Sequence, residues 1–243
     1  MTIDVAVSAV DQSSGEVASS PPAVAIMQPY FIPYAGYFRL FAATDLFVIF
    51  DCVQFPRRGW VHRNRLVGAD GRECWLTLPL AKASRDVRIS DLSFSHNACA
   101  VWEERLRRVP LIDGLQHVAP EMATMLRDVS GTPVDYLERL LGVIVSHLGL
   151  RWHVLRSSAL RVPHSIRGQE RIIEIARRLG ARRYINAPGG RTLYNAARFE
   201  EAGIELRFLD HYNGPSSSIL RRIIEEDRQS LVDDILASSR TSP

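Results

Sequence analysis

The chain has 243 residues, of which 46% are hydrophobic and 23% are charged. This is the composition of an ordinary globular protein with enough apolar material for a sizeable core, so folding requires neither disulfides nor a structural metal. The formal net charge is only +3, which is too small to make nucleic acid the expected partner. Lys82 is the single lysine among 30 basic residues, so arginine supplies nearly all of the positive charge.

The cysteines and the hydropathy of the sequence indicate in which cellular compartment the protein is expected. Three cysteines, none in a C-x-x-C pair, argue against a disulfide framework or zinc ribbon and fit a reduced, cytoplasmic location. No apolar run reaches the ~20 residues of a membrane helix, and the N-terminus does not read as a signal peptide. The histidines lack metal-type spacing, so neither a metal nor a cofactor is expected.

The chain divides into a leader and one domain. Residues 1–22 are small and polar, with serine and proline clusters, and are expected to form a flexible leader. Residues 23–240 are expected to form a single domain. It opens with an apolar strand at 23–27, a proline-rich loop at 28–33, a helix at 34–43 and an apolar strand at 46–50. This alternation, with unbroken apolar runs, is typical of a parallel sheet covered on both faces.

The middle of the chain has a different pattern, and the last third returns to the first one. Two strands joined by a tight turn are expected at 64–67 and 74–80, and helices at 98–109 and 133–148. Later strands are expected at 152–155, 183–186 and 204–209, and later helices at 169–179, 191–201 and 217–237, the last interrupted near Asp227. The elements predict a three-layer α/β fold with a mostly parallel, Rossmann-like sheet and a β-hairpin and helical insert in the middle.

In such folds ligands bind outside the carboxyl ends of the strands, so the residues that follow each strand are the candidates for a site. The first strand is followed by Gln28 and Tyr30, an amide and a phenol held in a loop that Pro29 and Pro33 make rigid. Such a loop either orients a substrate or simply packs its aromatic rings into the core.

A denser group follows the second strand. It contains a carboxylate, four arginines, a tryptophan, a histidine and two amides: Asp51, Gln54, Arg57, Arg58, Trp60, His62, Arg63, Asn64 and Arg65. Arginine binds carboxylate or phosphate through paired hydrogen bonds, so an anionic substrate such as a nucleotide-linked sugar or a phosphopantetheine arm would suit this group. The alternative is an ion-pair network around Asp51 and Asp45 without a catalytic role.

Three weaker signals complete the candidates. Ser157 and Ser158 follow the strand at 152–155, and a Gly-Gly turn at 189–190 precedes a helix and could bind an anion. Cys52 is either a nucleophile with His62 as its base or a small apolar filler.

Several spaced motifs resemble the WbqC-like family. They are Gln28-Pro29-Tyr30 with Pro33, Gly36 and Tyr37; Asp45 to Asp51 with Gln54; Arg58, Arg63-Asn64-Arg65 and Trp75-Leu76-Thr77; Ser157-Ser158; and Tyr184, Gly190 and Tyr194. The resemblance covers residues 23–238. The family's position after Asp51 often carries a second acid, whereas this chain has Cys52, which argues against a thiol nucleophile common to the family.

The resemblance implies a role in bacterial surface-polysaccharide or natural-product biosynthesis, with acyl or aminoacyl transfer onto an amine, for example of an amino sugar, as the expected reaction. Asp51, His62 and Gln28 are the expected catalytic residues. The expected substrate-binding residues are Tyr30, Gln54, Arg58, Asn64, Arg65, Ser157, Ser158, Tyr184, Gly190 and Tyr194. The expected partner is a small molecule, carrier-bound or nucleotide-linked. Two alternatives stay open: a non-catalytic module that holds a carrier protein or sugar nucleotide, and a hydrolase of activated acyl groups.

Overall fold

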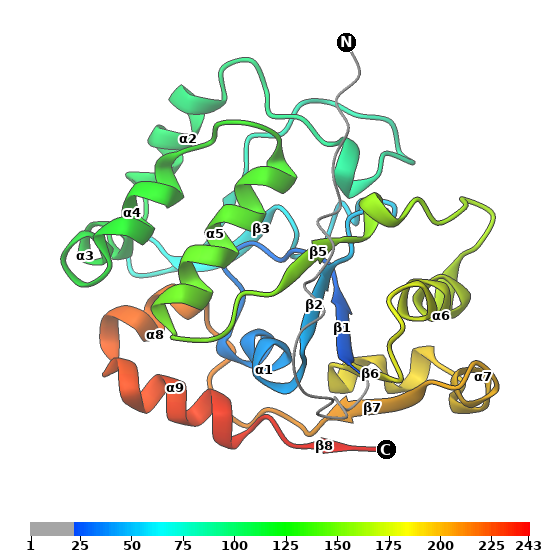
Figure 1. Ribbon diagram of the computed structural model, residues 1–243. Coiled ribbons are helices and arrows are strands. Elements are labelled where there is room, and N and C mark those ends of the chain that lie inside the picture. Colours follow the sequence, from blue (N-terminus) through cyan, green and yellow to red (C-terminus); the bar gives the residue numbers. More distant parts are fainter. Residues whose placement is uncertain (1–21) are drawn as a thin grey trace, which may run out of the picture.

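The computed structural model describes residues 22–243, and its centre is a six-stranded sheet in the order β5-β2-β1-β6-β7-β8 (Figure 1). Five strands are parallel, and β8 runs antiparallel to β7. The strands are β1 (Ala23–Met27), β2 (Leu46–Ile49), β5 (Val154–Arg156), β6 (Arg183–Asn186), β7 (Glu205–Leu209) and β8 (Thr241–Ser242). The predicted mixed α/β class with a mostly parallel sheet is confirmed. The expected leader lies, apart from Pro22, outside the described residues.

The order of the strands places a topological reversal between β1 and β6. The chain first adds β2 and β5 on one side of β1, then crosses back and adds β6, β7 and β8 on the other. The loops that follow β1 and β6 therefore leave from the carboxyl ends of two adjacent parallel strands, which is where ligands bind in open α/β folds.

Helices cover both faces of the sheet, because β1 and β2 present apolar side chains to both sides. Val24, Ile26 and Val48 pack with residues of α6 and α7, whereas Phe47 and Ile49 pack with α1, α5 and α9. The helices are α1 (Ala35–Ala43), α2 (Ala98–Leu106), α3 (Leu111–Val118), α4 (Pro120–Arg127), α5 (Pro133–His147), α6 (Gly168–Arg178), α7 (Ala196–Glu201), α8 (Ile219–Glu225) and α9 (Arg228–Ala237).

The helices differ from the sequence-based expectation in two places and agree with it in a third. The helix expected at 191–201 begins only at Ala196, because residues 188–193 form a 3-10 turn. The short helices α3 and α4 were not predicted, and Pro120 occupies the first turn of α4, where its missing N–H costs nothing. The predicted interruption near Asp227 is confirmed, since the Asp227 side chain accepts a hydrogen bond from the Ser230 N–H and caps α9.

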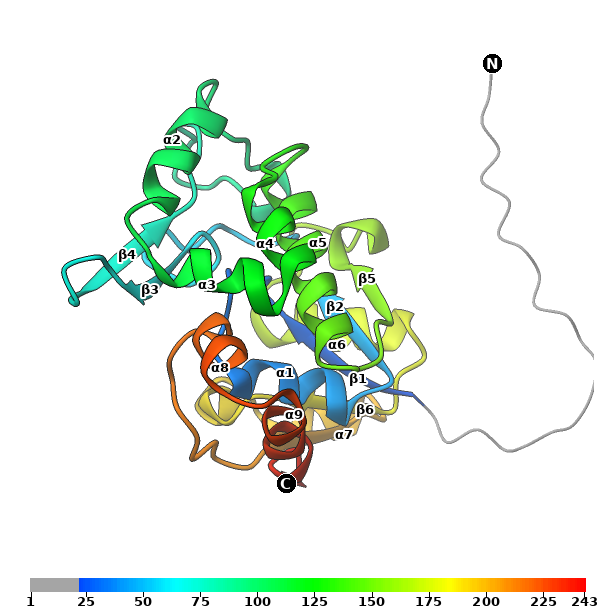
Figure 2. The same ribbon diagram turned by 90° about the vertical axis from the view of Figure 1, so that its left-hand side faces the viewer.

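The segment between β2 and β5 forms a lobe beside the sheet. It contains the antiparallel pair β3 (Arg63–Val67) and β4 (Glu73–Thr77), followed by α2 to α5. Figure 2 shows the β3–β4 hairpin projecting from this lobe. In this view α8 lies below the hairpin. Among the described residues, no helix is both long enough and apolar enough to cross a membrane.

Candidate functional site

Asp51 lies at the carboxyl end of β2 and is only 1% exposed. Its Oδ1 accepts hydrogen bonds from the Ser157 hydroxyl at 2.9 Å and the Ser158 N–H at 2.8 Å, and its Oδ2 accepts one from the Ser158 hydroxyl at 2.6 Å. The Ser157 hydroxyl oxygen in turn accepts from the backbone N–H groups of Asp51 and Cys52. The structure thus brings three of the expected site residues together, in the form of a buried latch between the ends of β2 and β5.

The loop after β1 is held in a strained conformation. Ile32 is fully buried and has a φ of 40°, a left-handed value that costs a β-branched residue about 1–3 kcal/mol. Its carbonyl oxygen accepts hydrogen bonds from Asn64 Nδ2 at 2.7 Å and from the Ser218 hydroxyl at 2.8 Å. Asn64 Nδ2 also donates to the Phe31 carbonyl at 3.1 Å. These bonds join three segments that are distant in sequence and offset the strain.

The same three segments, together with the start of α3, line a cavity of about 830 Å³, which we call cavity A. Its wall includes the loop after β1, the hairpin, the start of α3 and the start of α8. The lining residues are Tyr30, Pro33, Tyr34, Trp60, Asn64, Arg65, Leu66, Val67, Gly68, Glu73, Pro110, Leu111, Ser216, Ser217, Ser218, Arg221 and Glu225. Cavity A therefore joins the proline-rich loop to the arginine-rich stretch and brings together three of the expected binding residues, Tyr30, Asn64 and Arg65.

The aromatic side chains give cavity A hydrogen-bond donors as well as apolar surface. Burial and the neighbouring Tyr34 raise the pKa of Tyr30, so its phenol stays protonated and can donate a hydrogen bond at neutral pH. Trp60 lies 5.6 Å, between ring centroids, from Trp75 on β4. The Arg65 guanidinium lies 5.0 Å from the centre of the Trp75 ring, so Trp75, which is not itself in the lining, packs against two residues of the wall, Trp60 and Arg65.

Charge in cavity A is balanced by two ion pairs. Arg65 and Glu73 meet across the hairpin at 3.5 Å, and Arg221 and Glu225 pair at 2.9 Å, one turn apart on α8. All four side chains are about half exposed or more, so each pair contributes little to folding and each group remains accessible to a ligand.

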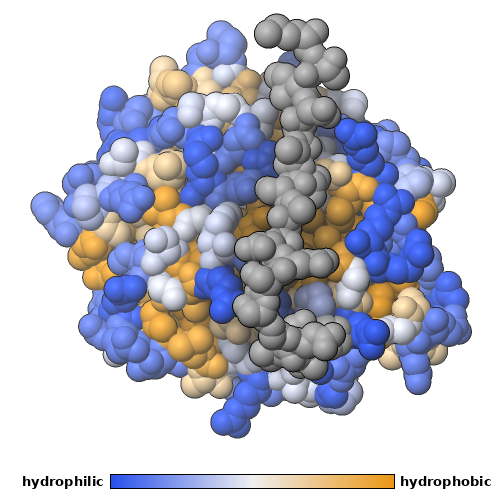
Figure 3. All heavy atoms as spheres, in the orientation of Figure 1, coloured by the Kyte–Doolittle hydropathy of each residue, from blue (hydrophilic) through white to orange (hydrophobic). Residues whose placement is uncertain are grey.

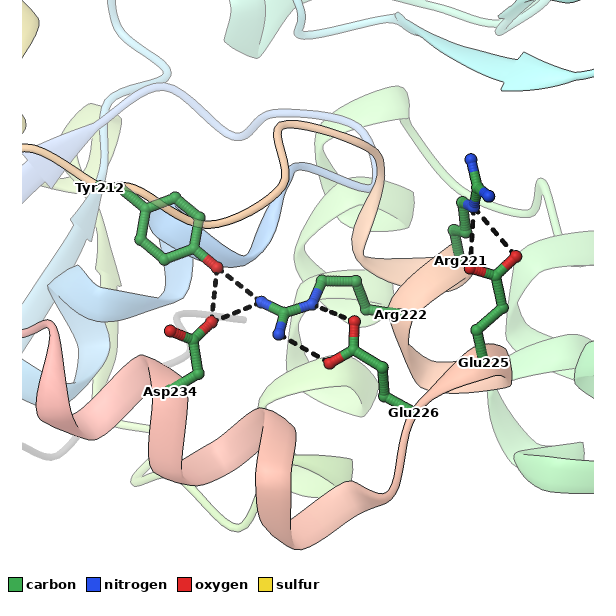
Figure 4. A network of polar contacts seen from close by, with 6 residues as sticks. All are labelled: Tyr212, Arg221, Arg222, Glu225, Glu226 and Asp234. Atoms are coloured by element: carbon green, nitrogen blue, oxygen red, sulfur yellow. Dashed lines mark hydrogen bonds and ion pairs between the residues drawn. The ribbon is translucent and has the colours of Figure 1, made fainter.

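The orientation of α8 is fixed by a second set of contacts on another of its faces (Figure 4). Arg222 is buried and donates to the Tyr212 hydroxyl, to Asp234 on α9 and to Glu226, and Tyr212 itself donates to Asp234 at 2.7 Å. The hydrogen bonds to Glu226 and Asp234 raise the pKa of Arg222, so its positive charge is permanent. Because neighbouring helical residues point about 100° apart, anchoring Arg222 turns the Arg221–Glu225 pair toward cavity A.

Ion pairing extends over the rest of the molecule. Many arginines pair with carboxylates on the same helix or on a neighbouring strand, as Arg177 and Arg178 do with Glu174 on α6 and Arg183 on β6 does with Glu205 on β7. On the face seen in Figure 3, hydrophilic side chains are dispersed among apolar ones instead of forming a single stripe.

Two of the comparisons with known proteins return matches. The model of the WbqC-like protein family matches residues 28–217, which is more than three-quarters of the chain. The chain belongs to the WbqC-like protein family. A protein of Mycobacterium tuberculosis named "Uncharacterized protein Rv1507c" is 27% identical over 192 residues, covering 77% of this chain and 82% of that protein. No solved structure matches.

Other expected residues of this WbqC-like protein lie outside the lining of cavity A. His62 precedes β3 and lines a different cavity, described below; burial, with a contribution from Arg63, lowers its pKa to about 4, so its imidazole is neutral at pH 7. The Gln28 carbonyl accepts a hydrogen bond from the Tyr37 hydroxyl. Gln54 and Arg58 are exposed on the loop before the hairpin.

The residues of β6 and of the turn after it form part of the core on the α6 and α7 side of the sheet. The Tyr184 ring is buried and stacks on Phe199, and its hydroxyl lies 3.3 Å from that of Tyr194. A Cβ at Gly190 would lie 2.3 Å from Asn186 Nδ2, so a larger residue there would force the Asn186 side chain to move. These side chains pack with α6 and α7, whereas the wall of cavity A is made by other segments.

Sequence reasoning missed the α8 wall of cavity A. Ser216, Ser217 and Ser218 follow the last parallel strand, and none of them is among the expected site residues. The signal was the spacing of Arg221 and Glu225, which places two opposite charges on one helical face. Only the tertiary structure shows that this face meets the hairpin.

Proposed function

We propose that this protein is a transferase that modifies a small molecule bound in cavity A, by acyl or aminoacyl transfer onto an amine such as that of an amino sugar. The observation that carries the proposal is cavity A itself, whose volume of about 830 Å³ lies within the range of small-molecule sites. Aromatic rings, hydroxyls and charges of both signs line one hollow, as a polar ligand with an apolar face requires. A role in bacterial glycan or natural-product assembly, in the cytoplasm, is part of the proposal.

The lining supports specific roles in such a reaction. The amine nitrogen attacks the activated carbonyl carbon, a C–N bond forms, the bond to the leaving group breaks with its electron pair, and the amine proton passes to a base. We assign that base to Glu225, whose carboxylate also attracts the amine. Arg65 and Arg221 bind the anionic part of the donor or acceptor, and Tyr30 donates to a hydroxyl or carbonyl of the ligand.

In this proposal Asp51 and Asn64 position other groups and do not take part in the reaction. The Asp51 carboxylate is occupied by three donors, so we assign it a positioning role between β2 and β5. Asn64 holds the loop that carries Tyr30. Catalytic roles for Asp51, His62 and Gln28 stay predictions, as do binding roles for Gln54, Arg58, Ser157, Ser158, Tyr184, Gly190 and Tyr194.

The topology supports the location of the site. Numbered along the chain, the strands of the large sheet lie in the order 3-2-1-4-5-6, which is the order of the Rossmann fold, although the last strand is antiparallel. We propose a Rossmann-like domain over residues 23–240 with the hairpin lobe as an insert. Tyr30 follows β1 and Ser216 follows β7, so cavity A lies beyond the carboxyl ends of the strands.

One observation favours a second candidate function, a non-catalytic module that holds a carrier-bound or nucleotide-linked ligand for another enzyme. Both carboxylates that line cavity A are exposed and paired with arginine, and the buried Asp51 does not line it. Such a module binds its ligand tightly and returns it unchanged.

The two functions are separated by incubating the purified full-length protein with a nucleotide-linked amino sugar and a panel of acyl and aminoacyl thioesters, with products followed by mass spectrometry. An acylated sugar formed by wild type, with at least a tenfold lower rate for Glu225→Gln, supports the transferase. The control is Glu104→Gln, which breaks an equivalent helical pair with Arg108 away from cavity A.

Three other results would contradict the transferase proposal. Ligand that binds but stays unchanged points to the binding module. Acid released from the thioester without an amine acceptor points to a hydrolase. A Glu225→Gln variant as active as wild type would remove Glu225 as the base.

A further inference from the structure

A second cavity, of about 470 Å³, lies where β3 begins and β4 ends, and we call it cavity B. Its wall is formed by the loop before β3, the segment after β4 and one side of α2. The lining residues are Phe55, Arg57, His62, Thr77, Leu78, Pro79, Leu80, Ala81, Lys82, Ala83, Leu92, Ser95, Asn97, Val101 and Arg105. The roles proposed for cavity A use none of these residues.

The charges around cavity B are all of one sign. Arg57, Lys82 and Arg105 line it, and within residues 22–243 its lining contains no aspartate or glutamate. None of the three cations forms an ion pair with a described residue, whereas both arginines of cavity A do. Three cations without a carboxylate partner around one hollow leave a concentrated positive potential there.

Both guanidinium groups are already held in place. Arg57 Nη2 donates to the carbonyl oxygens of Ala83 and Ser84 at 2.7 and 2.8 Å, and Arg105 Nη1 donates to the carbonyl of Thr77. A guanidinium has five N–H donors, so each arginine keeps further donors for a ligand while its neighbours fix its position. A preordered donor loses less conformational entropy when it binds an anion.

Uncharged groups of cavity B add to the same preference. Asn97 immediately precedes α2 and makes no side-chain capping bond, so its amide is available to a ligand, and no acidic residue lies in the first turn of that helix. Because Asn97 lines cavity B, the positive N-terminal end of the α2 dipole also lies at this cavity, where it favours an anion. His62 Nδ1 is buried without a partner among the described residues, and the His62 ring lies edge-on to Phe55. A polar ligand group supplies that missing partner.

We infer that cavity B is a second ligand site that binds a phosphate or diphosphate group through Arg57, Lys82 and Arg105. Forked arginine donors and a lysine point charge match the oxygens of a phosphoryl group. The apolar wall formed by Phe55, Leu80 and their neighbours fits an organic part attached to that group. This site is independent of the reaction proposed for cavity A.

The single lysine of the chain makes the inference directly measurable. Lys82 provides the only ε-amine, and the N-terminal amine is an internal reference. Full-length protein is treated with an amine-reactive acetylating ester, with and without inorganic pyrophosphate, at constant ionic strength. Labelling of each amine is quantified by peptide mass spectrometry. We expect pyrophosphate at about ten times its dissociation constant to slow acetylation of Lys82 about tenfold and to leave the N-terminal amine unaffected.

Matched variants identify the groups responsible. Arg57→Gln and Arg105→Gln are each expected to weaken protection of Lys82 at least tenfold, and two variants are used because either could disturb the neighbouring backbone. Arg182→Gln, an exposed arginine outside both cavities, should protect as wild type does. Glu225→Gln should also leave protection unchanged, so a failure of the cavity A proposal does not affect this result.

Three results would overturn the inference. The first is a rate of Lys82 acetylation that does not change at about 10 mM pyrophosphate, a concentration well above the roughly millimolar dissociation constant of a weak site. The second is equal slowing at the N-terminal amine, which indicates a general salt effect. The third is full protection in both arginine variants. Stronger protection by a nucleoside diphosphate than by pyrophosphate would show that the apolar wall also contacts the ligand.

Discussion

Removing the Asn64 amide tests whether the loop that carries Tyr30 is held by the hairpin. Asn64→Ala deletes three hydrogen bonds, two donated to the Phe31 and Ile32 carbonyls and one accepted from the Arg65 N–H. At about 1 kcal/mol net for each bond, the loss is about 3 kcal/mol. Because Asn64 lines cavity A, water can enter and satisfy part of the freed backbone, so we expect a decrease of about 2–3 kcal/mol in the free energy of unfolding.

Asn64→Asp keeps the shape of the side chain and reverses its hydrogen bonding toward the loop. A carboxylate facing the Phe31 and Ile32 carbonyl oxygens is repelled, so at pH 7 this variant should be less stable than Asn64→Ala. A protonated carboxyl can donate one of the lost bonds, so folding raises the pKa of the new side chain. The folded state then binds the proton more tightly than the unfolded chain, and the deficit should shrink as the pH falls toward 5.

Urea unfolding followed by tryptophan fluorescence measures both variants. Asn97→Ala is the control, since Asn97 is exposed and makes no capping bond, and its effect should stay within about 0.5 kcal/mol. An Asn64→Ala loss no larger than that of Asn97→Ala would refute the reasoning, as would an Asn64→Asp deficit that does not change with pH.

Three further predictions concern the latch, the buried histidine and the anchor of α8. Asp51→Ala should lower the free energy of unfolding by about 3 kcal/mol or more in urea titrations, because its carboxylate accepts three buried hydrogen bonds. When the pH is lowered from 6.5 to 4, the His62→Gln variant should lose about 1 kcal/mol less stability than the wild type. In the wild type the unfolded imidazole takes up a proton over this range, whereas the folded imidazole, with a pKa of about 4, largely stays neutral. Arg222→Gln should cost about 2 kcal/mol in the same assay, because its buried guanidinium bonds two carboxylates.

Each of these predictions has a control and a contradicting outcome. An Asp51→Ala protein of full stability but without activity would support its role as a base instead of a latch. Exposed His117 provides the comparison for His62, and an equal gain from His117→Gln would remove the special role of burial. Arg221→Gln should leave stability nearly unchanged, and a loss as large as that of Arg222→Gln would mean that the two faces of α8 are not distinct.

The sequence alone determined the alternation of strands and helices and the location of candidate groups after strands. The apolar runs at 23–27 and 46–50 can form their backbone hydrogen bonds and bury their side chains only as strands inside a covered sheet. Local composition therefore predicts these two strands. The break at Asp227 is also local in origin, since an acidic side chain caps a helix from its own turn. Short elements such as α3 and α4 escaped prediction because their helical state depends on packing.

Only the tertiary structure decided which of those groups share a site. Asp51 carries the same carboxylate whether it acts as a base or holds two strands together, and only the fold shows that Ser157 and Ser158, more than a hundred residues away, bond to it. Arg65 and Glu225 are distant along the chain and line the same cavity because β3 and α8 converge on the strained carbonyl of Ile32. Hydrogen bonds between distant segments depend on the register of whole elements, and no local pattern of residues encodes that register.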